Sequence, residues 1–232
     1  MKSNPGTRQR SMIGEKRWAA YAAAGAAALT AGAQTAEGDI THIVLNGGAG
    51  ERIEVGGSQY FSLVGNAAIN LFNVSAFQQN GETYAGAFVG VFNQSNFYGQ
   101  IVGFQTNGWP YASNLALDVD VSAGPFLPNS AFGTLAYGGP DSYTNAQFKD
   151  PGNGFLGFTF DAGTGTQYGW MRVTMDGSPG NSLTAQEYAF ADVGESIKVG
   201  QVDAIPEPSS LGLLALGAIG LAAMRRRRSM QR

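Results

Sequence analysis

The sequence contains no cysteine and a single histidine, His42, among 232 residues. These absences exclude disulfide scaffolds, thiolate metal sites, cysteine nucleophiles and most histidine-based metal centres. Charged residues make up 13% of the chain, well below the roughly 25% that is usual for soluble domains. The 34 glycines show no Gly-X-Y period, and 11% of the residues are aromatic, which excludes collagen and plain disorder. We therefore expect a packed core, no catalytic residues, no bound metal and no cofactor.

Positive charge is concentrated at the two ends of the chain, where ten of the fourteen Lys and Arg residues lie within 1–17 and 225–232. The first basic cluster is followed by an apolar, alanine-rich run that ends at Ala31-Gly32-Ala33. A cationic head, an apolar run and small residues at the cleavage positions are typical of a secretory signal peptide. We interpret residues 1–33 as this signal, with cleavage directed by Ala31 and Ala33 and translation starting at Met1 or Met12.

The C-terminal end combines three features in order: Pro206-Glu207-Pro208, an uncharged stretch over 211–224, and four consecutive arginines at 225–228. Fourteen helical residues reach only about 21 Å of a roughly 30 Å hydrocarbon core, so the arginines must snorkel to complete a span. Arginine clusters stay on the cytoplasmic side of a membrane. The stretch therefore predicts a single hydrophobic helix with a stop signal, and places residues 34–204 outside.

This order of features resembles the PEP-CTERM sorting signal of Gram-negative bacteria; the alternative is an ordinary tail anchor. The resemblance covers about 28 residues. It implies export across the inner membrane, transient anchoring there, cleavage by a membrane exosortase, and an exopolysaccharide-producing, biofilm-forming source. The matching residues are the sorting motif Pro206, Glu207 and Pro208 and the stop signal Arg225, Arg226, Arg227 and Arg228.

The exported segment 34–204 is predicted to be all-β. Residues 40–45 predict a first strand, 84–92 predict a strand packed on both faces, and 115–121 alternate aliphatic and acidic residues with period two. Turn signals recur, among them Asn46-Gly47, Asn80-Gly81, Asn107-Gly108, Asn153-Gly154 and Asp176-Gly177. Short strands with frequent turns indicate a sandwich or barrel. We expect a jelly-roll-like β-sandwich between an N-terminal signal helix (1–33) and the C-terminal sorting and anchor segment (205–232).

The clearest predicted hairpin joins residues 155–160 to 167–173 through a glycine-rich turn over 161–166. We expect it to lie centrally, with Leu156, Phe158 and Phe160 directed inward. Residues 145–201 as a whole resemble a segment of exported domains that carry the same sorting tag. This resemblance implies a jelly-roll-like sandwich and assigns no catalytic residue.

Charge limits the partners of the exported segment. Between residues 34 and 204 there are fifteen acidic and four basic residues, a net charge of about −11. Such a surface repels nucleic acid and anionic lipid. It is compatible with divalent cations and with neutral glycans.

Four local features were considered as sites. His42 lies in the first predicted strand, where a structural role is favoured over a catalytic triad. Asp118 and Asp120 are expected on one strand face about 7 Å apart, where a solvated face is favoured over a carboxylate pair or calcium ligands. The glycine run 47–50 fits no phosphate-binding pattern and is interpreted as a turn. Two aromatic pairs, Trp109 with Tyr111 and Tyr168 with Trp170, are candidate sugar platforms, although core packing explains them at least as well.

Three classes of function remain. The sorting tag and the lack of catalytic chemistry favour an exported surface or matrix protein with a structural or adhesive role and exopolysaccharide as a partner. A carbohydrate-binding module is the first alternative and requires exposed coplanar aromatic rings. A secreted hydrolase is the second alternative and requires acidic residues that converge in a cleft.

Overall fold

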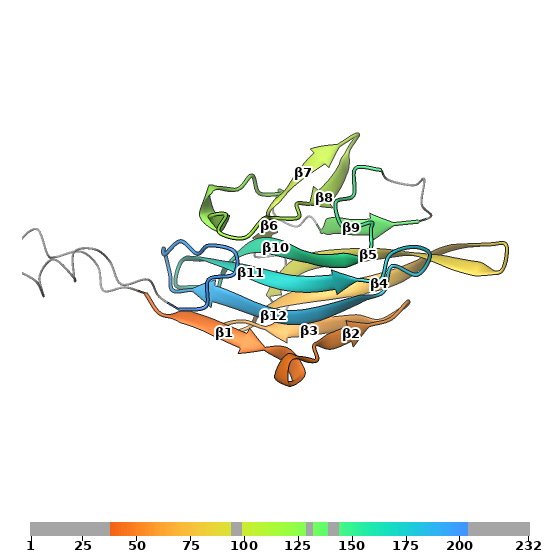
Figure 1. Ribbon diagram of the computed structural model, residues 1–232. Helices are drawn as coiled ribbons and strands as arrows, with labels where there is room; N and C mark the ends of the chain where they lie inside the picture. Colours follow the sequence, from red (N-terminus) through yellow and green to blue (C-terminus); the bar gives the residue numbers. More distant parts are fainter. Residues whose placement is uncertain (1–37, 94–98, 129–131, 139–143, 204–232) are drawn as a thin grey trace, which may run out of the picture. The chain divides into compact units, whose positions relative to one another are not determined.

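A computed structural model describes residues 38–93, 99–128, 132–138 and 144–203, which form one compact unit of two β-sheets (Figure 1). The predicted signal peptide with Ala31 and Ala33, the sorting motif and the hydrophobic stretch with its arginines lie outside the described residues. The two terminal helices expected from the sequence lie outside them as well.

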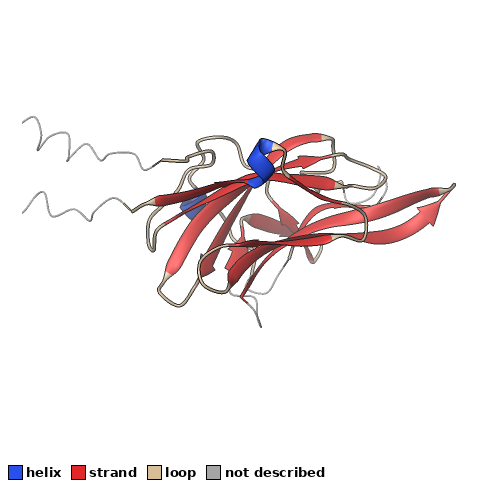
Figure 2. Cartoon of the chain, turned by 90° about the horizontal axis from the view of Figure 1, so that it is seen from below, coloured by secondary structure: helices blue, strands red, loops and turns tan. Residues whose placement is uncertain are grey.

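Sheet A and sheet B face each other as the two layers of a sandwich, which confirms the predicted all-β architecture (Figure 2). The strands of sheet A follow the order β1-β12-β11-β10-β6, with β2 also paired to β12. Those of sheet B follow the order β3-β4-β5-β9-β8-β7, and β8 and β9 are the parallel pair. Sheet A contains β1 (Ile40–Val44), β2 (Glu51–Ile53), β6 (Gly99–Ile101), β10 (Gly152–Asp161), β11 (Thr166–Met175) and β12 (Leu183–Ala191). Sheet B contains β3 (Ser58–Ser62), β4 (Ala67–Gln79), β5 (Glu82–Asn93), β7 (Gly103–Thr106), β8 (Trp109–Ala112) and β9 (Gly133–Tyr137).

The main core lies between the sheets and follows the period-two alternation of their strands. Leu156, Phe158 and Phe160 of β10 all point into it and are almost fully buried, which confirms the predicted inward face of this hairpin. The hairpin is central, because β11 and β10 occupy the middle of sheet A. A Cβ on Gly169 would overlap the ring of Phe158 and the Ala189 carbonyl, so glycine is required where β11 passes under that ring.

A second core covers the outer face of sheet A. It is built around Trp170 of β11, which lies beneath the chain segments 113–126 and 192–203. These two segments are joined by backbone hydrogen bonds, from Asp118 N to Val199 O and from Val121 N to Ile197 O. The C-terminal end of the described chain is therefore part of the fold up to Asp203.

The strand expected at residues 115–121 is wrong. The segment crosses the face of sheet A as irregular chain and ends in the short 3-10 helix η2 (Val121–Ala123). Asp118 has φ +63°, and Leu117 is 61% exposed whereas Val121 is fully buried. The alternating residues thus belong to a segment that covers sheet A and packs on it at a few residues. It does not form a strand, because its β-pairing with the neighbouring chain is limited to an isolated bridge.

Of the five predicted turns, two close β-hairpins, two lie in the connections that follow β1 and β11, and one lies inside a strand. Asn80-Gly81 and Asn107-Gly108 have positive φ at both residues and close the β4–β5 and β7–β8 hairpins, as expected for type I′ turns. Asn153-Gly154, in contrast, lies inside β10. A Cβ on Gly154 would collide with the Phe148 ring and lie 2.9 Å from the Asn114 Oδ1 atom, so this glycine permits a close approach and does not form a turn.

Two buried asparagines fasten the β11–β12 connection to sheet B. The side-chain amide of Asn181 donates to the carbonyl of Ala85 at 2.7 Å, and that of Asn73 donates to Asn181 O at 2.8 Å and to Gly180 O at 3.0 Å. Both asparagines are almost fully buried. Because buried carbonyls require donors, these amides fix how the end of sheet A meets sheet B.

Candidate functional site

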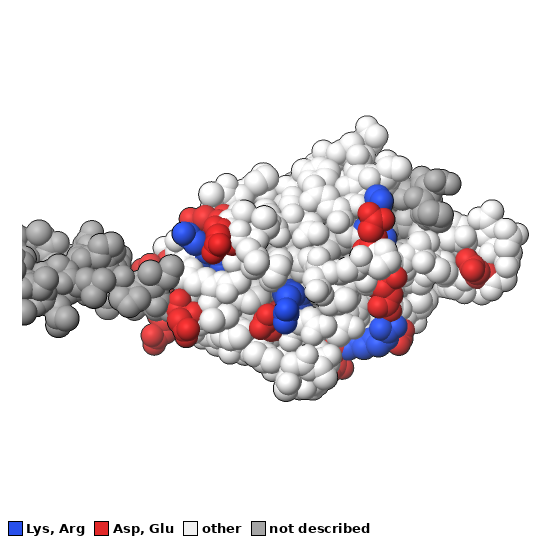
Figure 3. Space-filling view, in the orientation of Figure 1, with Lys and Arg blue, Asp and Glu red and all other residues white. Residues whose placement is uncertain are grey.

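The outer face of sheet B is the most distinctive surface of the described domain. Its six strands contain a single charged residue, Glu82, which lies next to the β4–β5 turn. Charged side chains elsewhere form small separate groups on an otherwise uncharged surface (Figure 3). Apart from Glu82 at the end of the hairpin, the strands of the sheet therefore present no charge that could select an ionic ligand by attraction.

Aromatic side chains occupy this outer face because the strand register aligns them. In β5, Ala87, Val89 and Val91 point into the core, so the alternate positions point outward. The register then places Phe72 of β4 opposite Phe88 of β5, and their rings stack with centroids 5.3 Å apart. Nine rings make contacts of this kind, in three groups: Tyr60 with Phe92, Phe77 with Tyr84, and a set of five formed by Phe72, Phe88, Trp109, Phe132 and Tyr137.

Four of these rings form a path across the strands: those of Trp109, Tyr137, Phe88 and Phe72. Centroids are 6.3 Å apart between Trp109 and Tyr137, 5.9 Å between Tyr137 and Phe88, and 5.3 Å between Phe88 and Phe72. Phe88 in the middle is buried by its neighbours, whereas Trp109 at one end is 40% exposed. Tyr60, which contacts Phe92 at 6.1 Å, is 60% exposed. The face is thus a layer of packed rings with accessible rings at its margins.

Two glycines of β5 make room for this layer. A Cβ on Gly86 would lie 2.5 Å from Cδ2 of Tyr137, and one on Gly90 would lie 2.7 Å from Cε2 of Phe92. The rings of Tyr137 and Phe92 therefore lie against bare backbone. Glycine inside a strand often marks such a close approach. Here the missing side chains let the two rings pack directly on the backbone of β5.

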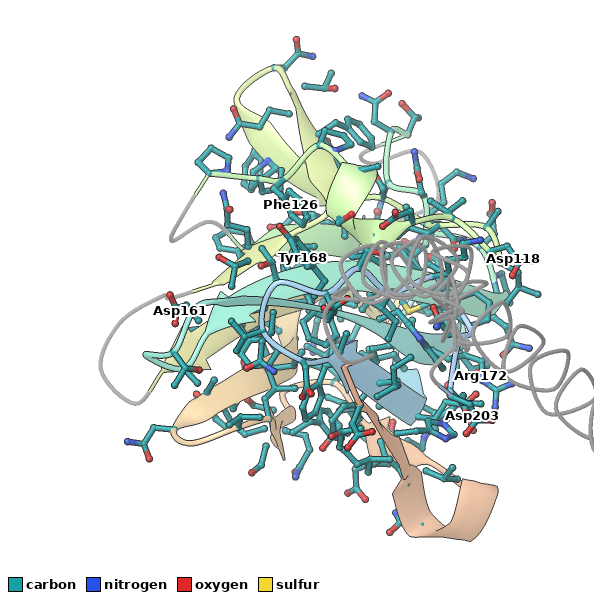
Figure 4. The ribbon with its side chains drawn as sticks, turned by 90° about the vertical axis from the view of Figure 1, so that its left-hand side faces the viewer. Asp118, Phe126, Asp161, Tyr168, Arg172 and Asp203 are labelled. Atoms are coloured by element: carbon teal, nitrogen blue, oxygen red, sulfur yellow. The ribbon has the colours of Figure 1, made fainter. Side chains whose placement is uncertain are left out.

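The predicted aromatic platforms do not form as pairs. Trp170 is buried in the second core and donates its indole N–H to Gln201 O at 2.9 Å. Tyr168 is half-buried beside Phe126, with ring centroids 6.1 Å apart (Figure 4). Tyr111 is buried. Trp109 is the one of the four that is largely accessible, and it belongs to the aromatic face of sheet B.

Most residues of this face were not predicted from the sequence. The prediction of a strand packed on both sides at 84–92 was correct, but the partners of that strand, such as Phe72 and Tyr137, were not identified. A signal was available: between Glu54 and Asp118 the sequence contains one charged residue, Glu82. Such a long uncharged stretch predicts a sheet that avoids charge on both faces.

His42 belongs to an ionic group on the outer face of sheet A. Its Nε2 lies 3.0 Å from Glu187 Oε2, and Arg172 Nε lies 3.0 Å from Glu187 Oε1. The histidine ring also lies 6.1 Å from the ring of Trp170. The acceptor for His42 is thus a carboxylate that Arg172 already neutralises, which agrees with the favoured structural role of this histidine.

A second ionic group joins β2 to the end of β11. Arg52 is hydrogen-bonded to both Glu54 and Asp176. The Arg52 guanidinium, together with the Ser182 hydroxyl, holds the pKa of the Glu54 carboxyl below its ordinary value. The hydrogen bonds from Arg52 to the carboxylates of Glu54 and Asp176 raise the pKa of the guanidinium above its ordinary value. This group is exposed and its members satisfy one another, so it ties two elements together.

The prediction that Asp118 and Asp120 project from one strand face is wrong, because residues 115–119 do not form a strand. Asp120 accepts hydrogen bonds from the backbone N–H and the hydroxyl of Ser122, at 2.9 and 2.7 Å, and so caps η2. Asp118 lies in a turn with left-handed backbone. In the described ranges, no three His, Asp or Glu side chains are grouped so that they could hold a metal ion.

Comparison with known proteins identifies the C-terminal segment. Residues 204–228 match the family described as the PEP-CTERM protein-sorting motif, which confirms the resemblance seen in the sequence. The matched range contains Pro206, Glu207 and Pro208 and the arginines 225–228. It indicates an exported chain that an exosortase recognises while the chain is transiently anchored in the membrane.

Other comparisons add no relative. Neither the curated proteins nor the solved structures gave a match to this chain. In the part of the chain that the structure covers, no helix has the length and apolar character needed to cross a membrane. The hydrophobic stretch at 211–224 lies outside that part.

Proposed function

We propose that this protein is an exported, non-catalytic component of the cell surface or extracellular matrix, and that it adheres to neutral exopolysaccharide through the outer face of sheet B. The observation that carries the proposal is the concentration of nine aromatic rings on a sheet whose six strands contain one charged residue. The sorting motif supports it, because export brings the domain to the compartment where such polymers accumulate.

Aromatic rings suit sugars for a physical reason. The face of an aromatic ring is electrostatically negative, so it attracts the polarised C–H groups on the flat side of a pyranose. Tyr60 and Trp109 offer such faces at the margins of the layer, and Tyr60 also carries a hydroxyl for hydrogen bonds. Because the domain has a net charge of about −11, a polymer of uronic acids is repelled while a neutral polymer is not.

The test measures binding of segment 34–204 to an immobilised neutral glucan and to a polyuronate at low ionic strength. We expect binding to the glucan alone. The variants Tyr60→Ala and Trp109→Ala should each weaken it roughly two- to tenfold, because an aromatic contact contributes about 0.5–1.5 kcal/mol. Leu117→Ala is the control, since Leu117 is as exposed as Tyr60 but lies on the segment that covers sheet A.

The outcomes separate the candidate functions. Equal binding to both polymers, or glucan binding that survives both aromatic substitutions, would contradict the proposed face. Selective binding of one short oligosaccharide on a glycan array would favour the alternative, a carbohydrate-binding module. Release of reducing ends from any polymer would favour the hydrolase.

A further inference from the structure

The β4–β5 hairpin extends beyond the strands that flank it. In sheet B, β3 pairs with β4 only over residues 68–72, and β9 pairs with β5 only over residues 86–89. Residues 74–79 pair with residues 82–86 around the Asn80-Gly81 turn, and Figures 1 and 2 both show this hairpin extending from the sandwich. We call residues 74–84 the arm.

The arm exposes backbone and apolar side chains together. Phe77 and Tyr84 stack across it with centroids 4.9 Å apart, yet Phe77 is 42% exposed and Val74 is 41% exposed. A two-stranded ribbon that packs against nothing is only marginally stable in water. The arm therefore gains stability from any strand that pairs with its edge.

The edge formed by β4 is the longer open one. On the β5 side, Ala85 is already bonded to Pro179 O and to Gly138 N, whereas the β4 side is bonded to its neighbour only up to Asn73. The six residues that follow, 74–79, read Val-Ser-Ala-Phe-Gln-Gln and include no charge and no proline. Natural edge strands are usually protected by lysine, proline or a bulge; here the protection is limited to the β-bulge between Ser75 and Phe77.

We propose that this edge is a self-association surface, on which the β4 edge of one copy pairs antiparallel with the β4 edge of a second copy. An unpaired strand edge selects another strand, and a neutral edge can meet its own copy without repulsion. The single charge of the arm, Glu82, lies on β5, so pairing through β4 keeps the two Glu82 carboxylates apart. Because the two strands run in opposite directions, Gln78 and Gln79 of one copy lie near Val74 and Ser75 of the other.

The position of the arm suits this contact. Gly38 and Asp203, the ends of the described chain, lie at the opposite end of the domain from the arm (Figure 1). A pair joined arm to arm leaves both ends free. The remainder of the surface carries most of the net negative charge of the domain, which keeps copies apart elsewhere.

The absence of cysteine from the chain allows a direct test. Single cysteines are introduced into the full chain at positions 75, 76, 77, 78 and 79, one at a time, and each variant is produced in a Gram-negative host with an oxidising periplasm. Gln105→Cys is the matched control, because Gln105 is also an exposed glutamine on an edge strand of sheet B. Disulfide-linked dimer is quantified on non-reducing gels.

We expect at least one arm position to yield several times more dimer than Gln105→Cys, with a maximum at the position that lies opposite itself in a two-fold pair. Adding Glu82→Lys, which leaves the β4 edge intact, should preserve the cross-link, and adding Val74→Lys should remove it. Dimer yields at all five positions no higher than that of the control would overturn the proposal. Tyr60→Ala leaves the arm unchanged, so failure of polysaccharide binding is read separately from failure of self-association.

Discussion

At the residue scale, glycine and aromatic side chains act as matched partners in this domain. Gly169 of β11 lies under the ring of Phe158 in the main core, and Gly86 of β5 lies under the ring of Tyr137 on the outer face of sheet B. In both places the ring occupies the volume that a Cβ would fill. The high glycine content is therefore explained in part by packing between strands, in addition to turns.

Phe158 provides the sharpest test of the main core. Replacing it with alanine removes a fully buried ring and leaves a cavity above Gly169, so the free energy of unfolding of segment 34–204 should fall by about 3–5 kcal/mol. Phe77→Ala is the control, because Phe77 is largely exposed and its loss should cost less than about 1 kcal/mol. Urea denaturation measures both; similar losses for the two variants would contradict the burial assigned to Phe158.

Asp161 should make stability depend on pH. Its carboxylate accepts backbone hydrogen bonds from Gly163 N at 2.7 Å and Gly165 N at 3.1 Å, and these bonds hold its pKa below the ordinary value. A lowered pKa in the folded state stabilises the fold above the unfolded-state pKa of about 3.9, and this contribution is lost as the pH falls below it. The unfolding free energies of wild type and Asp161→Asn, measured in urea, should thus differ at pH 7 and converge toward pH 3. A difference that is constant with pH would be evidence against this linkage.

At the element scale, connections decide how the two sheets are held together. The β11–β12 connection is bonded to sheet B through Asn73 and Asn181, and the segment 192–203 is bonded to residues 118–121 over the outer face of sheet A. The second contact explains why Trp170 is buried although its side chain points to the outer face of sheet A. The alternation of β11 alone predicts that this face of sheet A is exposed to solvent. In the structure it is covered by a segment that is distant in sequence.

Asn181 tests the first of these connections. Asn181→Gly retains the left-handed backbone conformation at this position, φ +49°. It removes the buried amide that donates to the carbonyls of Ala85 and Gly138, so we expect a loss of about 1–3 kcal/mol in unfolding free energy. Asn107→Gly is the matched control, since Asn107 has φ +52° in an exposed turn and makes no contact of this kind to the described chain. Equal stability of the two variants in chemical denaturation would show that the buried amide is dispensable.

At the scale of the whole molecule, the chain joins an acidic β-sandwich to a sorting segment with basic residues at its end. Pro206 and Pro208 cannot donate backbone hydrogen bonds and favour extended chain before each of them. We expect the exosortase to cut near these prolines. The exported species would then lack Arg225–Arg228 and carry the net charge of the domain alone.

Mass spectrometry of the mature protein from its native host tests this processing. We expect a C-terminus near residues 206–208, and slower maturation of the Glu207→Ala variant. Detection of Arg232 on the exported species would contradict processing. Normal maturation of Glu207→Ala would contradict a part for that carboxylate in recognition.

Local signals in the sequence were sufficient for several features. The Asn80-Gly81 and Asn107-Gly108 turns were predictable because their backbone conformation depends on the residues themselves, and the inward face of β10 followed from its alternation. Residues 115–121 show the limit of such reasoning. Their alternation is as regular as that of β10, but no strand runs beside them over their length, and the segment became a cover instead.

The sequence by itself determined the PEP-CTERM segment, the strand-rich composition and the tight turns, because each depends on residues that are neighbours in the chain. The tertiary structure alone decided which aromatic rings are buried and which form the face of sheet B. Trp170 and Trp109 both lie in strands, yet one is covered by the segment 192–203 and the other lies at the margin of an aromatic layer. The difference arises from strand order and from contacts between distant segments, which the pattern of a single strand does not encode.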